Sequence, residues 1–302
     1  MISVIMSNFN GERYIKDSII SVLNQDFCDY EFIIVDDGST DNSTEIISNF
    51  HKQHKDKIFP IYKSINEGQS EGFNVGFKAS KGEIICFIDS DDIWFSDKLR
   101  NVSDFFTHHK EFSLHQHNLY KIENDKLTDN KFRDDLFHGD YFDYIKKIGN
   151  SSLLPQFIPT SGLSFPRHIL EKIFPIPKDF RTCADGYLTR TCFCYGDVLS
   201  SSECWGAYRI HGSNNVFGNS QFNNNLYISQ LLIPKLNEFY SQNNIDLRFS
   251  LPKKPYIIGF LLLSFIRPVV RYFFLRLFPE MPGEKIAKES LEVLQTWRRK
   301  LL

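Results

Sequence analysis

Cysteine pairs and the common nucleotide-binding signatures are missing from this chain of 302 residues. Its six cysteines include no C-x-x-C pair, which argues against zinc ribbons, thioredoxin-type redox motifs and a disulfide scaffold. Neither G-x-G-x-x-G nor G-x-x-x-x-G-K-S/T follows the first apolar run, so dinucleotide oxidoreductases and P-loop NTPases are disfavoured. The first residues also lack the basic region and small-residue cleavage site of a secretory signal, which predicts a reducing, cytoplasmic compartment.

A large excess of charge of one sign is missing as well. The net charge is -2, from 35 Lys and Arg against 37 Asp and Glu. This disfavours a nucleic-acid binder, which needs a basic face to neutralise phosphates. The charge is unevenly spread, however, because residues 252–302 hold ten Lys and Arg against four Asp and Glu.

The C-terminal segment also lacks a hydrophobic run long enough to span a bilayer. The eleven apolar-rich residues 256–266 fall short of the roughly 20 that a transmembrane helix needs. Basic and aromatic residues intermixed over 252–280 instead predict an interfacial segment that contacts anionic lipid. The alternatives are a helical pair that packs on the rest of the chain or on a second subunit in a homo-oligomer.

The first hundred residues contain a regular alternation of short apolar runs and helical patterns. Strands are expected at 2–6, 31–35, 58–62 and 83–88, and helices at 11–25, 40–51 and 69–80. Such alternation predicts an α/β fold: a Rossmann-like, mostly parallel sheet with helices on both faces. Ligands of these sheets bind outside the carboxyl ends of the strands.

Acidic residues gather at two of these expected strand ends. Asp36 and Asp37 follow the second strand, and Asp89, Asp91 and Asp92 follow the fourth. Turn chemistry accounts for the first pair, but clustered like charges repel one another unless a cation offsets them. Carboxylates and substrate phosphates together suit Mg²⁺ or Mn²⁺, and such a metal neutralises a departing diphosphate. These residues therefore predict a site for a metal-bound sugar nucleotide.

Three segments closely resemble family 2 glycosyltransferases: VIMSNFN at residues 4–10, IVDDGSTD at 34–41 and FIDSDD at 87–92. The resemblance extends over about residues 1–215. It implies a GT-A catalytic domain there, with nucleotide-sugar binding in about 1–100 and the acceptor and base part in about 101–215. A C-terminal helical module at 216–302 would follow. The family also implies a nucleotide-diphosphate sugar donor, a divalent metal and inversion at the anomeric carbon.

The same resemblance assigns roles to individual residues. Asp37 would accept a hydrogen bond from the base, Asp89 would face the ribose, and Asp91 with His211 would hold Mn²⁺ or Mg²⁺. The donor-binding residues would be Ser7, Phe9, Asp36, Asp37, Asn66, Gly68, Asp89, Ser90 and Asp92. The acceptor side would comprise Thr160, Ser161 and Gly162.

The general base of an inverting transfer would be Asp185, in a segment where relatives have Glu-Asp and this chain has Ala184-Asp185. A second departure is Gly72-Phe73, where many relatives have Ala-Arg. His115 and His117 share one face of a strand but lack a nearby third ligand, so a structural role is favoured for both.

The function expected from these patterns is inverting transfer of a sugar, from a UDP-sugar to a saccharide or lipid-linked glycan. Surface polysaccharide biosynthesis at the cytoplasmic face of the membrane is the expected setting. Two alternatives stay open. A sugar-nucleotidyltransferase needs a Gly-rich basic loop after the first strand, which residues 8–13 match poorly. A non-catalytic, membrane-bound scaffold with a degenerate donor site would be compatible with Gly72-Phe73 and Ala184.

Overall fold

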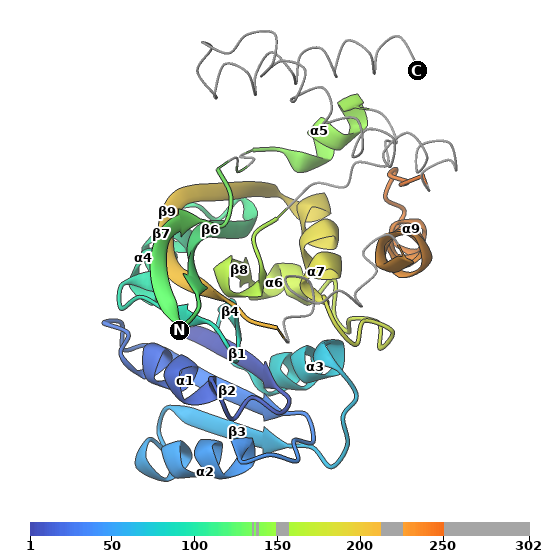
Figure 1. The fold of residues 1–302 in the computed structure, drawn as a ribbon. Coiled ribbons are helices and arrows are strands. Elements are labelled where there is room, and N and C mark those ends of the chain that lie inside the picture. The colour runs from blue at the N-terminus through green and yellow to red at the C-terminus, as the bar shows by residue number, and fades with distance from the viewer. Residues whose placement is uncertain (135, 137–138, 149–156, 213–225, 251–302) are drawn as a thin grey trace, which may run out of the picture. The chain divides into compact units, whose positions relative to one another are not determined.

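The computed structural model describes residues 1–134, 136, 139–148, 157–212 and 226–250, and Figure 1 shows their arrangement. Residues 1–250 form one compact unit and residues 251–302 a second. The predicted membrane-contacting segment 252–280 lies outside the described residues. None of the helices in the described ranges is both long enough and apolar enough to cross a membrane.

Four parallel strands form the N-terminal half of the sheet, in the order β3-β2-β1-β4. Their side chains are mostly apolar and buried, as expected for strands covered on both faces. The predicted strands are confirmed to within three residues at each end. Their bounds are β1 Ile2–Asn8, β2 Tyr30–Asp36, β3 Ile58–Tyr62 and β4 Ile84–Asp89.

The other half of the sheet mixes strand directions. Beyond β4 the order is β8-β6-β9-β5, and β7 pairs with the free part of β6. Strand β8 runs antiparallel to β4, whereas β6 and β9 pair in parallel. These strands are β5 Ile93–Trp94, β6 Phe112–Glu123, β7 Lys126–Lys131, β8 Leu163–Pro166 and β9 Asp197–Ile210. The purely parallel arrangement is thus limited to the half that the alternating pattern covers.

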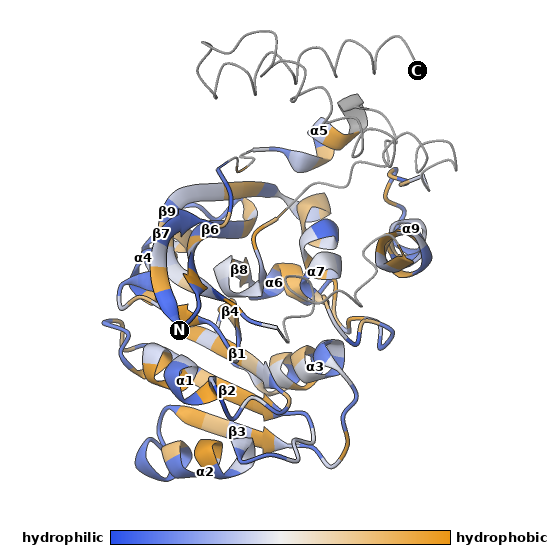
Figure 2. Cartoon of the chain, viewed as in Figure 1, coloured by the Kyte–Doolittle hydropathy of each residue, from blue (hydrophilic) through white to orange (hydrophobic). Residues whose placement is uncertain are grey.

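Helices cover both faces of the sheet, as predicted, and each face has its own core (Figures 1 and 2). One face packs against α1 Ile15–Leu23, α2 Ser43–Gln53 and α4 Lys98–His108. The other packs against α3 Gln69–Ala79, α5 Tyr141–Ile148, α6 Arg167–Leu170, α7 Asp185–Cys192 and α9 Ile233–Gln242. Short helical turns add η1 Thr160–Gly162, η2 Phe193–Tyr195 and η3 Tyr227–Leu232.

Helix α1 begins at Ile15, four residues later than predicted. The backbone N–H groups of Tyr14 and Ile15 both donate to the Gly11 carbonyl, at 2.9 Å each, so residues 11–14 form a turn. This turn brings Gly11 close to Asn8 and Ser90, and a Cβ at Gly11 would lie 2.2 Å from Asn8 Oδ1. The late start of α1 therefore lets the chain pass close to two strand ends.

Helix α9 belongs to the first compact unit. Its residues Ile233, Leu236 and Tyr240 join the core that contains α3 and α7, and the Tyr240 hydroxyl donates to the Arg190 carbonyl at 2.6 Å. The predicted domain division at residue 215 stays a prediction. In packing terms the described chain is continuous to Ser250.

Candidate active site

The chain turns sharply after β4, at Asp89–Asp92, which we call the β4 loop. The Asp92 N–H donates to the Asp89 carbonyl at 3.2 Å and closes the turn. Carboxylate oxygens of Asp89, Asp91 and Asp92 lie within 4.8 Å of one another. The predicted acidic cluster is therefore formed at the carboxyl end of the parallel strands.

Asp92 anchors this loop to the turn η1 and to strand β9. It is fully buried, and its carboxylate accepts hydrogen bonds from Ser161 Oγ at 2.6 Å and from the Arg209 N–H at 2.8 Å. The Ser18 hydroxyl lies within hydrogen-bond distance of the Ser90 carbonyl (2.9 Å) and the Asp92 carbonyl (2.6 Å). Asp92 and Ser90 thus hold the shape of the loop.

Asp91, in contrast to the buried Asp92, is partly accessible to solvent, with 27% of its side chain exposed. Its Oδ2 lies 2.9 Å from His211 Nε2, and the His211 ring packs against Tyr14 with ring centroids 4.8 Å apart. The two residues predicted as metal ligands are therefore in contact, although 120 residues separate them in the chain.

The acidic cluster is electrostatically unfavourable without a cation. Burial, and then the charge of Asp91, raises the pKa of both Asp89 and Asp92 well above the usual range. A divalent cation would offset this repulsion, and carboxylate and imidazole ligands suit Mn²⁺ or Mg²⁺. Asp91, which is partly exposed, and His211, which contacts it, are the residues predicted to hold the ion, whereas Asp92 is fully buried.

The second acidic turn, Asp36–Ser39, follows β2, and we call it the β2 loop. Asp36 is 1% exposed and accepts from the Ser39 N–H (2.9 Å), Ser39 Oγ (2.7 Å) and Asn8 Nδ2 (2.8 Å). Asp36 therefore supports this turn internally, and the donor-binding role predicted for both Asp36 and Asp37 stays a prediction.

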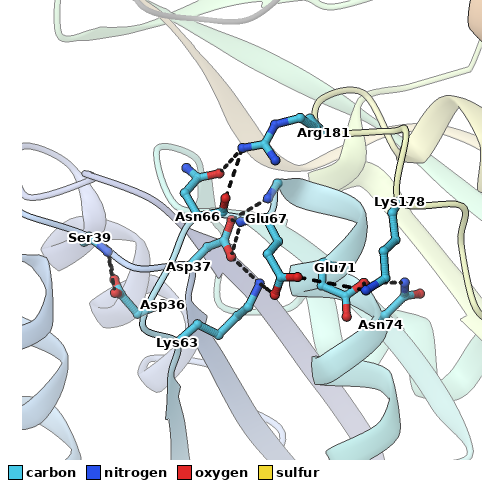
Figure 3. Close-up of polar contacts among 11 residues, drawn as sticks. Asp36, Asp37, Ser39, Lys63, Asn66, Glu67, Glu71, Asn74, Lys178 and Arg181 are labelled. Carbon is cyan, nitrogen blue, oxygen red and sulfur yellow. Dashed lines mark hydrogen bonds and ion pairs between the residues drawn. The ribbon is translucent and has the colours of Figure 1, made fainter.

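Asp37 is equally buried, at 2% exposed, and bonds a lysine and two backbone N–H groups (Figure 3). Its Oδ1 lies 2.5 Å from Lys63 Nζ, and its Oδ2 accepts from the Gly68 N–H at 2.7 Å. The Glu67 N–H lies 3.1 Å from both oxygens. Two residues predicted at the donor, Asp37 and Gly68, are therefore directly bonded.

Three other predicted donor-binding residues flank these loops. The side chain of Ser7 lies close to helix α3, since a Cβ on Gly72 would be 2.1 Å from the Ser7 hydroxyl. Phe9 extends into solvent, with 47% of its surface exposed. Asn66 Oδ1 accepts from the Arg181 guanidinium at 2.7 Å (Figure 3).

The departure at Gly72-Phe73 has a packing explanation. Phe73 is fully buried, and its ring lies 4.5 Å from that of Phe87 on β4, measured between centroids. An arginine at position 73 would place a charge in this core. Gly72 lets α3 approach β1 more closely than an alanine would allow.

Asp185 is the first residue of α7, and it lies near the β4 loop. Its charge contributes to the raised pKa of Asp89, after burial and the charge of Asp91. Burial also raises the pKa of Asp185 itself, and the nearby Arg190 opposes this rise. The preceding Ala184, which stands where relatives have an acid, is fully buried.

The predicted acceptor-side residues form the buried turn η1 next to the β4 loop. Thr160 is 3% exposed and Ser161 is fully buried. Ser161 donates to Asp92 and accepts from the Asp89 N–H at 3.1 Å. A Cβ on Gly162 would lie 2.7 Å from the His117 carbonyl, so this glycine permits close packing. In this structure the turn supports the acidic cluster, and its predicted contact with an acceptor stays a prediction.

Lys63 and Lys98 support the site and were missed from the sequence. Lys63 follows β3 directly and pairs with Asp37, so a basic residue at a strand end was a usable signal. Lys98 is fully buried and lies 3.3 Å from the Ser161 carbonyl and 2.8 Å from His117 Nε2. Burial lowers the Lys98 pKa to about 8. The favoured structural role of His117 agrees with this contact.

Comparison with known proteins identifies the family. Residues 3–174 match the family model described as glycosyl transferase family 2. The chain belongs to this family. This confirms the family and the enzyme class, glycosyltransferase, that the motifs implied.

Curated relatives are glycosyltransferases and related proteins of bacteria. An uncharacterized glycosyltransferase of Nostoc sp. is 41% identical over 217 residues, which are 71% of this chain and 66% of that protein. The minor teichoic acid biosynthesis protein GgaA of Bacillus subtilis is 38% identical over 111 residues, 35% of this chain and 25% of its own length. The chain thus spans less than two thirds of these relatives.

Solved structures share the fold at low identity. S. aureus TarS 1-349 in complex with UDP-GlcNAc has a TM-score of 0.63 and 18% identity, covering 97% of this chain and 80% of that one. The mannosyltransferase PcManGT of Pyrobaculum calidifontis, with GDP-Man and Mn²⁺, has a TM-score of 0.56 and 14% identity. It covers 98% of this chain and 82% of the mannosyltransferase. These similarities confirm the GT-A type of α/β fold.

Proposed function

We propose that this protein transfers a sugar, with inversion, from a UDP-sugar to a saccharide or lipid-linked glycan in the synthesis of a surface polysaccharide. The observation that carries the proposal is the cluster of Asp89 and Asp91 with His211 at one edge of the sheet, to which Gln69 links the residue before Asp185. The name of GgaA and the UDP-GlcNAc bound to TarS support the acceptor class and the nucleotide.

The donor would bind across the β2 and β4 loops. Asp37 and Asn66 would contact the base, Asp89 would contact the ribose, and Asp91 with His211 would hold Mn²⁺ or Mg²⁺ against the diphosphate. The ion, when bound, supplies charge that stabilises the departing diphosphate. The Mn²⁺ in the mannosyltransferase structure supports this choice of metal.

Asp185 would remove the proton of the acceptor hydroxyl as its oxygen attacks the anomeric carbon. A carboxylate is sufficient, because the oxocarbenium-like centre requires only a modest nucleophile. The raised pKa of Asp185 makes it a stronger base than an exposed aspartate. The bond to the diphosphate breaks on the opposite face of the sugar, so the configuration inverts.

Calorimetric titration of UDP with and without Mn²⁺ tests the donor site. The wild type should bind UDP only with the metal, and Asp91→Ala should abolish that binding. Asp129→Ala, an exposed acid on β7, is the matched control and should bind as the wild type does. Metal-independent binding, or equal binding by Asp91→Ala, would contradict the metal site.

A screen of UDP- and GDP-sugars then tests turnover. Release of nucleotide diphosphate from one donor, and its loss in Asp185→Asn, is the expected result. Release of pyrophosphate would instead identify a sugar-nucleotidyltransferase. Binding without turnover of any donor would favour the scaffold.

We also propose that residues 252–280 bring the enzyme to the cytoplasmic face of the membrane. The support is their sequence, in which Lys253, Lys254, Arg267, Arg271 and Arg276 alternate with apolar and aromatic residues. Co-sedimentation with vesicles should require anionic lipid and should fall when these five residues are changed to Gln. Equal binding to purely zwitterionic vesicles would contradict the electrostatic part.

A further inference from the structure

Gln69, the first residue of α3, lies between the β4 loop and the turn that carries Asp185. Its Nε2 lies 3.3 Å from Asp89 Oδ1, and its Oε1 accepts from the Ala184 N–H at 2.9 Å. One side chain therefore contacts both the predicted ribose-binding acid and the backbone next to the predicted base.

The chemistry of these two contacts requires an amide. Asp89 offers an acceptor and the Ala184 N–H offers a donor, so the bridging group must donate with one atom and accept with the other. An ionised Glu has no donor, and a Leu has neither group. Asn has the right groups but is one methylene shorter.

The backbone around Gln69 is fixed against the same segment. The Gln69 N–H donates to the Arg181 carbonyl at 2.9 Å. Gly68 has a φ of +97°, and a Cβ there would lie 2.5 Å from Arg181 Cα. The N-terminal end of α3 and the chain before Asp185 are therefore in direct backbone contact. This contact fixes the position of the Gln69 backbone relative to the two groups that its side chain bonds.

The turn that presents Asp185 is held from its other side as well. Cys183 has a φ of +55°, and its carbonyl accepts from the Tyr227 hydroxyl at 2.8 Å. Gly186 leaves room for Tyr227, since a Cβ at this position would lie 2.5 Å from the hydroxyl. Gln69 thus fixes the side of this turn that faces the β4 loop.

We propose that Gln69 is a positioning residue that sets the distance between the bound donor and the base Asp185. The inference rests on the proposed function. The β4 loop holds the sugar nucleotide and α7 holds the base, and the Gln69 amide joins the two by hydrogen bonds. An error of about 1 Å between reacting groups lowers a rate by about 10²-fold, so a bridge of this kind acts on kcat.

The test compares Gln69→Leu with Asn74→Leu. Asn74 lies on the same helix and also bridges it to the chain before Asp185, because its amide bonds the Ile176 carbonyl at 2.9 Å and N–H at 2.8 Å. These two bonds involve neither Asp89 nor Asp185. Both changes remove an amide bridge of the same type, so both should lower the melting temperature.

Only the Gln69 change should slow the reaction. With the donor found in the screen, kcat of Gln69→Leu should fall at least about tenfold while KM for the donor changes less than about threefold. Asn74→Leu should keep kcat within about twofold of the wild type. Equal kcat values for the two variants, or a Gln69→Leu protein as fast as the wild type, would overturn the proposal.

Gln69→Glu separates the two halves of the bridge and serves if the Leu variant does not fold. Glu keeps an acceptor for the Ala184 N–H but puts a negative charge beside Asp89. It should recover part of kcat relative to Gln69→Leu and to Gln69→Met, a second variant that lacks the amide, while KM for the donor rises. A Glu variant no faster than Gln69→Met would overturn the role of the Ala184 bond. Full activity of Asp185→Asn would overturn both this proposal and the assigned base, whereas a failure of Gln69 alone leaves the base intact.

Discussion

The β2 and β4 loops have similar sequences, Asp-Asp-Gly-Ser and Asp-Ser-Asp-Asp, but their carboxylates differ in how closely they crowd one another. Asp36 and Asp37 are buried and bonded to hydroxyl, amide, ammonium and backbone donors. In the β4 loop, carboxylates lie within 4.8 Å of one another, and burial with mutual repulsion raises the pKa of Asp89 and Asp92. The acids of the first loop stabilise it. In the second loop the carboxylates repel one another, and a bound cation would offset that repulsion.

The largest effect that this comparison predicts is on stability. Asp37→Ala removes a buried partner of Lys63 and leaves the Gly68 N–H without its acceptor. Breaking such a pair costs about 3–5 kcal/mol. The free energy of unfolding by urea should fall by this amount in Asp37→Ala and by less than about 1 kcal/mol in Asp91→Ala. Similar losses in both variants would remove the distinction between the loops.

A large effect is also expected on the pH dependence of the reaction. Asp185 must be ionised to accept a proton, and burial raises its pKa. Activity should therefore begin to fall, as the pH is lowered, at a higher pH than an exposed aspartate would give. Arg190→Gln removes the charge that opposes this rise, so its acid limb should move to still higher pH. Profiles of kcat against pH for the two proteins measure this, and coincident limbs would count against Asp185 as the base.

In the β4 loop, removing a carboxylate is expected to raise stability at neutral pH, by less than Asp37→Ala lowers it. A carboxyl whose pKa is raised by folding binds its proton more tightly in the folded protein. Stability is therefore lost as the pH rises from the unfolded pKa, about 3.9, through the raised value. Asp89→Asn cannot ionise and should escape this loss.

The measurement is the melting temperature without added metal. Asp89→Asn should melt about 2–4 °C above the wild type at pH 7.5, which corresponds to about 1 kcal/mol, and the gain should vanish near pH 4. Asp36→Asn is the matched change in the β2 loop and should lower the melting temperature at pH 7.5. A loss of stability in both variants would show that repulsion in the β4 loop is already relieved.

The smallest effect is expected where charges meet at the surface. Lys178 is 74% exposed and lies 3.8 Å from Glu71 and 3.9 Å from Glu67 (Figure 3). Exposed pairs of this kind contribute about 0–1 kcal/mol. Lys178→Ala should change the melting temperature by less than about 2 °C, and a larger drop would mean that this pair fixes the loop before Asp185.

Much of the parallel half could be predicted from the sequence because its signals are local. Apolar runs predicted β1 to β4, and their carboxyl ends brought Asp37 and Asp89 to one edge of the sheet. Helix α3 was predicted to within one residue. These features depend on periodicity and on the parallel pairing rule, both of which a single chain displays.

The partners of these acids could not be predicted in the same way. Gln69 and the Arg209 N–H reach the acidic cluster through contacts between distant parts of the chain, and no local pattern marks Gln69. Ser161 was predicted on the acceptor side, but its bond to Asp92 was not. Thr160 and Ser161 illustrate the limit, because a small-residue turn looks alike whether it faces a ligand or supports a loop. The folded chain adds that Ser161 is buried against Asp92, which the sequence alone does not display, and the acceptor role of the turn stays a prediction.

The hydroxyl of Tyr227 also determines how far the chain can be shortened. A protein cut after residue 215 would keep every family motif but lose the bond to Cys183 and the α9 side chains Leu236 and Tyr240 from the core beneath α7. The apolar surface left behind would favour aggregation, and the turn before Asp185 would be held on one side only. A cut after Ser250 retains both contacts, so the smallest fragment with a complete core is defined by packing and extends beyond the last recognisable motif.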